Sequence, residues 1–235
     1  MMRPAYLLTT GFVLALCSCT VEHDREYSTK TEHQKIARDK SEMTRAEFTI
    51  AAGELTVSGG TNELMEGDFT YGDPSFQPQI RYHNSSFRSL LELEQRPNKT
   101  SSGNVESKWN VHLNEEVPMD VKVKIGAGES RLDLGKLNLR SVEVEVGAGQ
   151  VKLDLRGTPK HDYDVKVRGG VGEASIWVPK EARVTADAAG GIGDIEVHGF
   201  QKTDGHYENN AAKDAQVRIH LDVKGGIGSI RLYSE

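Results

Sequence analysis

Hydrophobic and polar residues alternate with a period of two along much of the second half of the chain. From Val121 to Ile125 and from Val142 to Val146, every second residue is Val or Ile, and the residues between them are Lys or Glu. Side chains of a β-strand point alternately to its two faces, so this pattern predicts strands with one buried and one solvated face. The apolar faces must then pack against one another.

Six segments repeat one pattern, in which a hydrophobic residue and a glycine-containing corner are followed by a short alternating strand. They begin at Ile50, Ile125, Val146, Arg168, Ala189 and Lys224. Corner glycines of four successive repeats lie 21, 23 and 21 residues apart, at Gly128, Gly149, Gly172 and Gly193. Such a period is typical of solenoid proteins, and about 21 residues is too short for a strand, a crossover helix and a return strand. We therefore expect each repeat to form one rung of about three short strands.

Glycines at these corners are expected to have a structural role. A corner between stacked strands often needs a positive φ angle or leaves no room for a β-carbon, and glycine meets both conditions. The ten glycines concerned are Gly126, Gly128, Gly147, Gly149, Gly170, Gly172, Gly191, Gly193, Gly226 and Gly228.

The repeat predicts an all-β fold, a single-stranded β-helix or β-solenoid of about five to six rungs. We expect the solenoid over residues 121–235, after an N-terminal β-rich region over residues 46–120. A polar stretch, 200–215, is expected to form a loop on one corner. The last strand, 230–233, is expected to be the uncapped end of the solenoid. This C-terminal end would then be open to self-association or to a strand of another envelope protein.

Residues 1–18 have the features of a bacterial lipoprotein signal peptide. Arg3 supplies a positive start, and residues 5–16 are apolar but too few to span a bilayer as a helix. Leu16, Cys17 and Ser18 then precede Cys19 in the pattern of a lipobox. This predicts lipidation of Cys19 and anchoring to a membrane of the bacterial cell envelope, on the periplasmic side or at the cell surface. An ordinary secretory signal is the alternative, and the charged residues 19–45 are expected to form a tether.

The charge of the chain argues against nucleic acid as a partner. Its net charge is −6, and loss of Arg3 with the signal peptide would make it −7. A protein that binds the phosphate backbone needs a surplus of Lys and Arg.

No catalytic, cofactor or metal motif is recognisable in the sequence. The glycine corners are followed by strands, whereas a dinucleotide site needs a helix there. The repeats lack the column of carboxylates that a calcium site requires, and the histidines have no paired spacing. We therefore expect no enzymatic activity, no cofactor and no metal.

Two weaker candidates remain. Trp109 and Trp177 could stack on sugars, although Trp177, which should face outward, is more simply explained by packing against neighbouring rungs. Asp133 and Asp154, one rung apart, come nearest to the paired carboxylates of a polysaccharide-active enzyme.

The motifs resemble a known family. The blocks "GAGESRLDL" and "GGVGEASIWVP", with two later "GGIG" corners, are similar to those of the toast-rack proteins of the bacterial cell envelope. The C-terminal part also resembles the extracytoplasmic domain of LiaF-type envelope-stress sensors. The resemblance covers about residues 45–233 and implies a right-handed β-helix, without an established activity or a set of binding residues.

These observations favour a membrane-anchored lipoprotein that acts as a non-enzymatic binding or scaffold module of the cell envelope. A regulatory partner in envelope-stress sensing is the first alternative. An enzyme that acts on polysaccharides is the second, and it rests on analogy of fold alone.

Overall fold

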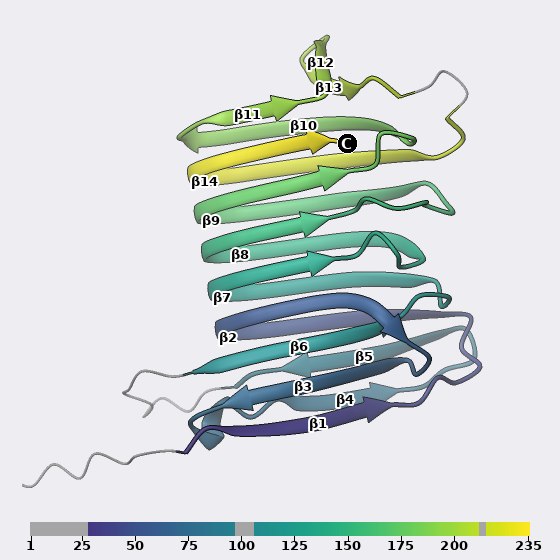
Figure 1. Ribbon diagram of the computed structural model, residues 1–235, viewed down its shortest axis with the longest axis vertical. Coiled ribbons are helices and arrows are strands. Elements are labelled where there is room, and N and C mark those ends of the chain that lie inside the picture. The colour runs from purple at the N-terminus through teal and green to yellow at the C-terminus, as the bar shows by residue number, and fades with distance from the viewer. Residues whose placement is uncertain (1–27, 97–105, 212–214) are drawn as a thin grey trace, which may run out of the picture.

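The computed structural model describes residues 28–96, 106–211 and 215–235. It contains strands β1 to β14 and one short 3-10 turn, η1 (Pro74–Phe76). The strands join in one hydrogen-bonded sheet that is wound into a stack (Figure 1). The predicted all-β solenoid is therefore confirmed.

Six rungs make up most of the stack, and each contains a glycine with a positive φ angle. The rungs bend at these corners (Figure 1). Five are single strands: β2 (Met43–Thr61), β7 (Met119–Asp133), β8 (Leu139–Asp154), β9 (Tyr163–Val178) and β14 (Arg218–Ser234). In the sixth, the corner separates β10 (Arg183–Ile192) from β11 (Ile195–His198). Each rung thus has a first arm before the corner, a second arm after it and a return turn. The expectation of about three strands per rung is wrong, because the bent strand takes up most of the repeat.

The two glycines of a corner do different work. The second one has a φ angle between +132° and +138° in every rung, a conformation that residues with a β-carbon rarely adopt. The first one packs against the rung beside it: a β-carbon on Gly147 would lie 2.4 Å from the carbonyl oxygen of Gly126. The second glycine therefore meets both expected reasons, since a β-carbon on Gly149 would lie 1.8 Å from the carbonyl oxygen of Gly128, whereas the first glycine meets only that of close approach.

Inward side chains of both arms form one hydrophobic core along the stack. Neighbouring rungs are parallel and in register, so that Val123, Val144 and Val167 lie over one another. All three are buried, as are Leu132 and Leu153 on the second arms. Burial of each such side chain contributes roughly 1.5 to 3 kcal/mol before conformational entropy is subtracted.

The order of the rungs differs from their order in the sequence. Strand β14 lies between β9 and the β10–β11 rung, with parallel pairing on both sides. The C-terminal strand is therefore an inner rung (Figure 1), and the expectation that it forms the open end of the solenoid is wrong. The repeats are so alike that their sequence does not reveal which one is adjacent to which.

The polar stretch expected to be a loop contains a β-hairpin. Strands β12 (Phe200–Thr203) and β13 (His206–Asn209) pair through a two-residue turn, Asp204-Gly205. Both turn residues have positive φ angles, which is the conformation that Asp-Gly favours in hairpins. Strand β13 also pairs with β10 at Thr185 and Ala186, so the hairpin covers part of the end rung.

At the other end, each arm of β2 is extended by its own strands. The first arm is followed by β5 (Arg88–Glu94) and β4 (Gln79–His83), and the second arm by β6 (Ser107–Asn114), β3 (Met65–Tyr71) and β1 (Lys30–Ile36). The predicted boundary at residues 120 and 121 falls inside β7, and the stack continues through it. Strand β1 and the start of β2 lie within the predicted tether 19–45, which can therefore apply at most to residues 19–29.

The side chain of Gln95 lies against the corner of β2, at the place where the other rungs have the corner of a neighbouring rung. This buried side chain accepts hydrogen bonds from the N–H groups of Ala51 (2.9 Å) and Ala52 (3.0 Å) and donates one to Ser107 Oγ (2.8 Å). Because a side chain and not a glycine backbone lies here, this corner has Ala51 where the other rungs have glycine.

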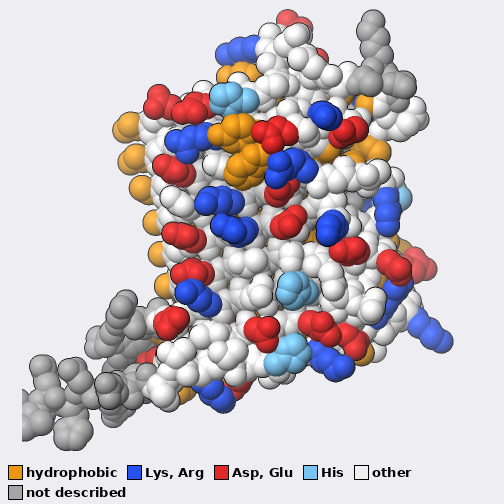
Figure 2. Space-filling view, in the orientation of Figure 1, with side chains coloured by type: hydrophobic (Ala, Val, Ile, Leu, Met, Phe, Trp, Pro, Cys, Tyr) orange, Lys and Arg blue, Asp and Glu red, His pale blue; other side chains and the backbone are white. Residues whose placement is uncertain are grey.

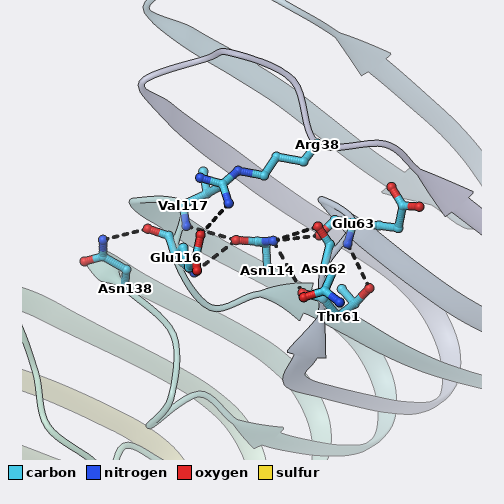
Figure 3. Close-up of polar contacts among 8 residues, drawn as sticks. All are labelled: Arg38, Thr61, Asn62, Glu63, Asn114, Glu116, Val117 and Asn138. Carbon is cyan, nitrogen blue, oxygen red and sulfur yellow. Dashed lines mark hydrogen bonds and ion pairs between the residues drawn. The ribbon is translucent and has the colours of Figure 1, made fainter.

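A buried asparagine joins two turns at the return side of the stack (Figure 3). Asn114 Nδ2 donates to the carbonyl oxygens of Thr61, Asn62 and Glu63 at 3.0 to 3.3 Å. Its Oδ1 accepts from the N–H groups of Glu116 and Val117 at 3.0 and 3.1 Å. One amide thus satisfies five backbone groups and fixes the turn after β2 to the turn that leads into β7.

Candidate interaction surface

One carboxylate of the pair considered for hydrolysis, Asp154, forms an ion pair with Arg156. Asp133 and Asp154 are register neighbours, as expected. Burial acts to raise the pKa of Asp154, but hydrogen bonds from the Arg156 side chain and backbone N–H outweigh it and lower the pKa below its usual value. A general acid needs the opposite shift, so Asp154 does not fit that role in glycoside hydrolysis.

Metal-binding side chains do not gather at one point. Within residues 28–96, 106–211 and 215–235, no three His, Cys, Asp or Glu side chains are placed to hold an ion. Asp162, which follows His161 in the sequence, accepts a hydrogen bond from the backbone N–H of Arg218 at 2.8 Å.

The two tryptophans have different surroundings. Trp109 is buried against Phe69, with ring centroids 5.5 Å apart and an edge-to-face arrangement. It belongs to the core and is not available to a sugar. Trp177 lies on the outward face of the second arm of β9, as its alternation with Ile176 and Val178 predicted.

Trp177 begins a stack of three rings, which we call the ring stack: Trp177, Tyr233 and His198. Its members are register neighbours on β9, β14 and β11. The ring centroids of Trp177 and Tyr233 are 5.3 Å apart and those of Tyr233 and His198 are 5.0 Å apart, with nearly parallel planes. Arg156 covers the other face of Trp177 at 5.9 Å. The rings therefore cover each other's faces, and among the described residues only the outer face of His198 has neither a ring nor a guanidinium group against it.

An ion ladder runs beside the ring stack on the same three strands. Arg231 contacts Glu173 at 3.1 Å and Glu196 at 3.5 Å. Figure 2 shows this charged and aromatic area on the face formed by the second arms. These half-exposed ion pairs contribute little to stability individually, but they select which rungs fit together.

A row of apolar side chains lies on the outside of the corners, which we call the corner ridge. From the β2 rung to the end rung, its members are Ala52, Ala127, Ala148, Val171, Ile227 and Ile192. Figure 2 shows it as the column of hydrophobic side chains at the left edge. Val171, Ile227 and Ile192 are 53%, 51% and 71% exposed, and Phe87 is the one other large apolar side chain so exposed in the part of the chain that the structure describes.

The side chains of the corner ridge are larger in the rungs in which the inward residue before the corner is smaller. The inward residue before the corner is Ile50, Ile125 or Val146 in the three rungs with alanine on the ridge. In the rungs with Val171, Ile227 and Ile192, it is glycine: Gly169, Gly225 and Gly190. Apolar volume is thus moved from the inside of the corner to its outside in the three rungs nearest β11. Stability alone would favour the buried position, so the exposed row is the candidate interaction surface of this chain.

A small cavity marks the place of this exchange. It has a volume of about 30 Å³ and is lined by residues that include Val146, Gly169, Ala174 and Ile230. The Cδ1 atom of Ile230 lies 3.2 Å from where a β-carbon on Gly225 would be, and so fills that rung. At Gly169 no atom comes within 4 Å of that place. The cavity is far smaller than sites for small-molecule ligands, so the candidate surface is the exterior.

An open hollow on the first arms, with a volume of about 630 Å³, contains Lys124, Glu145 and Arg168. Lys124 pairs with Glu145 at 3.3 Å, and Arg168 pairs with Asp222. These cations are already paired, so the hollow does not form an anion site.

The predicted corner glycines are brought together in one column, whereas Cys19 lies outside the described residues. The ridge, Tyr233 and His198 were missed as surface features. A signal for the ridge was present, because the residue between the two corner glycines changes from Ala to Val and Ile along the repeats. No helix in the part of the chain described here has the length and apolar character needed to cross a bilayer.

Comparisons with known proteins agree with this architecture. The family model for the N-terminal domain of toast_rack matches residues 25–177, which is more than half of the chain. A second model, the C-terminal region of LiaF, described as cell wall-active antibiotics response, matches residues 127–232. No curated protein matches in sequence.

Two crystal structures illustrate the likeness. A "putative cell adhesion protein" from Clostridium sporogenes is 29% identical, with a TM-score of 0.82 over 88% of this chain and 100% of that one. A "putative adhesin" from Bacteroides fragilis is 10% identical over 87% and 97% of the two chains, with a TM-score of 0.30, which is too low to support an argument.

Proposed function

This chain belongs to the toast-rack family, and on that basis we propose that it is a lipid-anchored, non-enzymatic binding module of the bacterial cell envelope. The observation that carries the proposal is the corner ridge. Three large aliphatic side chains are exposed in a row, in the three rungs nearest β11. Contiguous exposed apolar residues of this kind are characteristic of interaction sites.

The two ends of the stack differ in a way that supports a role in contact with other molecules. Strand β1 lies at one end, and β10 to β13 lie at the other (Figure 1). A chain attached to a membrane through Cys19, before β1, would hold the large ridge residues away from its anchor. The match to a protein described as a "putative cell adhesion protein" over its whole length is consistent with such a role.

Anchoring is tested with Cys19→Ser. We expect the wild-type protein to incorporate an alkyne-labelled fatty acid and to sediment with membranes, and the variant to do neither. The Cys17→Ser variant is the matched control and should still be labelled. Labelling of the Cys19→Ser variant would contradict the proposal, as would an unlabelled wild type.

Binding is tested by replacing the three large residues of the corner ridge with alanine, which the other three ridge positions already have. The substitutions Val171→Ala, Ile227→Ala and Ile192→Ala are combined in the unanchored Cys19→Ser chain, and adherence to intact cells of the source bacterium is measured. We expect at least a tenfold loss of adherence, since apolar contact area is removed while the fold is kept. Phe87→Ala, an exposed site away from the ridge, should bind normally. Equal adherence of the triple variant and this control would refute the role of the ridge.

A regulatory role in envelope stress is the second candidate, and it rests on the match to the LiaF C-terminal model. Deletion of the gene should then change the response of the cell to wall-active antibiotics. An unchanged response would leave the binding role alone.

A further inference from the structure

The outer edge of β11 is uncovered. In the end rung, β10 has β13 along part of its outer edge, whereas β11 pairs with β14 and with no other strand among the residues described. Backbone N–H and C=O groups of Ile195–His198 that point away from β14 are therefore without a strand partner. An edge of this kind can accept an added strand.

The hydrophobic core is also incompletely closed at β11. Ile195 and Val197 point inward, yet both are only half-buried. Their register neighbours on β14, Ile230 and Leu232, are 4% and 0% exposed. A further strand over β11 would bury the first pair as β14 buries the second.

Three rows of side chains stop at this rung with one side open. The corner ridge ends at Ile192, the ion ladder at Glu196 and the ring stack at His198. Each row has a neighbour of matching chemistry below it and none above. The rows therefore specify what a further strand should carry.

We propose that β11 is a docking site for one extended segment of a partner protein, which adds parallel to β11 and continues the second-arm sheet. The segment carries aliphatic residues opposite Ile195 and Val197, a basic residue opposite Glu196 and an aromatic residue opposite His198. Parallel addition is expected because the second arms below β11 pair in parallel. The choice of a basic residue follows from charge complementarity, since Glu196 is 48% exposed and faces outward. This inference rests on the proposed binding function and names its partner chemistry.

The chain itself supplies a suitable probe. It is the segment 225–234, GGIGSIRLYS, in which residues 230–233 already pair in parallel with β11 from the other side, with Arg231 opposite Glu196 and Tyr233 opposite His198. A labelled peptide of this sequence is titrated into the full-length protein in detergent micelles. We expect saturable binding by fluorescence anisotropy. In NMR spectra of the labelled protein, we expect the chemical shift changes to be confined to the amides of β11 and its immediate neighbours.

A charge swap provides the matched control. The peptide in which the arginine is replaced by glutamate should bind at least tenfold more weakly. The Glu196→Arg protein should reverse this preference and bind the glutamate peptide better than the arginine peptide. Circular dichroism confirms that the variant is folded, and Lys152→Glu, an exposed charge reversal two strands from β14, should leave the preference unchanged.

Several results would overturn the inference. They are absence of binding at millimolar peptide, equal binding of both peptides to both proteins, and chemical shift changes that lie outside β10, β11, β12 and β14. Self-association of the protein alone that is lost in Glu196→Arg would identify the occupant as a second copy, and would also refute a separate partner. If the ridge variant loses adherence while the peptide does not bind, the proposed function stands and this inference fails.

Discussion

At the scale of the residue, glycine occurs near the corner for two unrelated reasons, and only one of them is a constraint on the backbone. Gly149 has a φ angle of +133°, and a β-carbon on it would lie 1.8 Å from the carbonyl oxygen of Gly128. Gly169 has neither constraint, because the space that its β-carbon would occupy is empty. Glycine at position 169 accompanies the shift of apolar side-chain volume from the core to the corner ridge, and the bend of the strand does not require it.

This difference gives a matched pair of substitutions. Gly149→Ala should lower the free energy of unfolding by about 3 kcal/mol or more, through backbone strain and collision with the neighbouring rung. Gly169→Ala should stay within about 0.5 kcal/mol of wild type. Urea unfolding at constant pH measures both, and a similar loss in the two variants would contradict the distinction.

Residue patterns in the sequence identified both the corner glycines and the inward positions, because each depends on local geometry that repeats. The outward stacking of Trp177 was foreseen from alternation, but its ring partners were not. Tyr233 is 56 residues away in the sequence, and only the rung order brings it next to Trp177.

At the scale of the element, β1 is the strand held mainly by polar contacts. Only Ile36 among its residues packs against the core. Glu32 binds β1 to its neighbours: its carboxylate accepts hydrogen bonds from Lys30, from Tyr71 Oη at 2.7 Å and from Gln77 Nε2 at 3.0 Å. These bonds, led by that from Lys30, lower the pKa of Glu32 from its ordinary value of 4.5 to about 2.

Attachment of β1 should therefore weaken in acid. A carboxylate whose pKa is lower in the folded state stabilises that state above its ordinary pKa, and the contribution is lost as the pH falls from about 4.5 toward 2. The protection factors of the β1 amides, which correct for the intrinsic dependence of exchange on pH, should fall over this range. In Glu32→Gln these protection factors should be lower already at pH 6 and should depend less on pH, while Glu66→Gln on β3 serves as the control. Identical pH profiles for wild type and Glu32→Gln would disprove this account.

The hairpin β12–β13 was not predicted from the sequence, because its segment was expected to form a loop. Its Asp-Gly turn lies between four-residue segments and is a known hairpin signal. The flanking strands are short and polar, so their period gave no indication of burial. What fixes them is tertiary: Phe200 and Tyr207 pack against the core, and His206 contacts Asp187 on β10.

At the scale of the whole molecule, the ends of the stack decide whether it stays a single unit. The hairpin covers β10, and β1 and β4 end the two arms of the sheet on the other side. Repetition made the solenoid predictable, but it also hid the position of β14, because every rung offers a similar surface to its neighbour. The ion ladder and the ring stack distinguish the rungs, and these depend on pairs that are distant in sequence.

Removal of the hairpin should cause association. Replacing residues 201–208 by a two-glycine link would uncover the outer edge of β10 and the apolar residues beneath it. We expect dimers or larger species by light scattering at concentrations where the wild type shows a smaller mass. Asp204→Asn, which keeps the turn, should behave as the wild type does. An unchanged mass for the shortened chain would show that the hairpin is not a cap.

Insertion of β14 between β9 and β10 also has a consequence for biosynthesis. Strands β5 to β9 can join the stack in chain order, since each of them has a neighbour among the strands that precede it. The β10–β11 rung cannot, because the strand that connects it to β9 is translated last. Until then the growing chain holds a finished lower stack and an unattached rung. Premature termination before residue 218 would therefore leave β9 with an open face and β10 with no support.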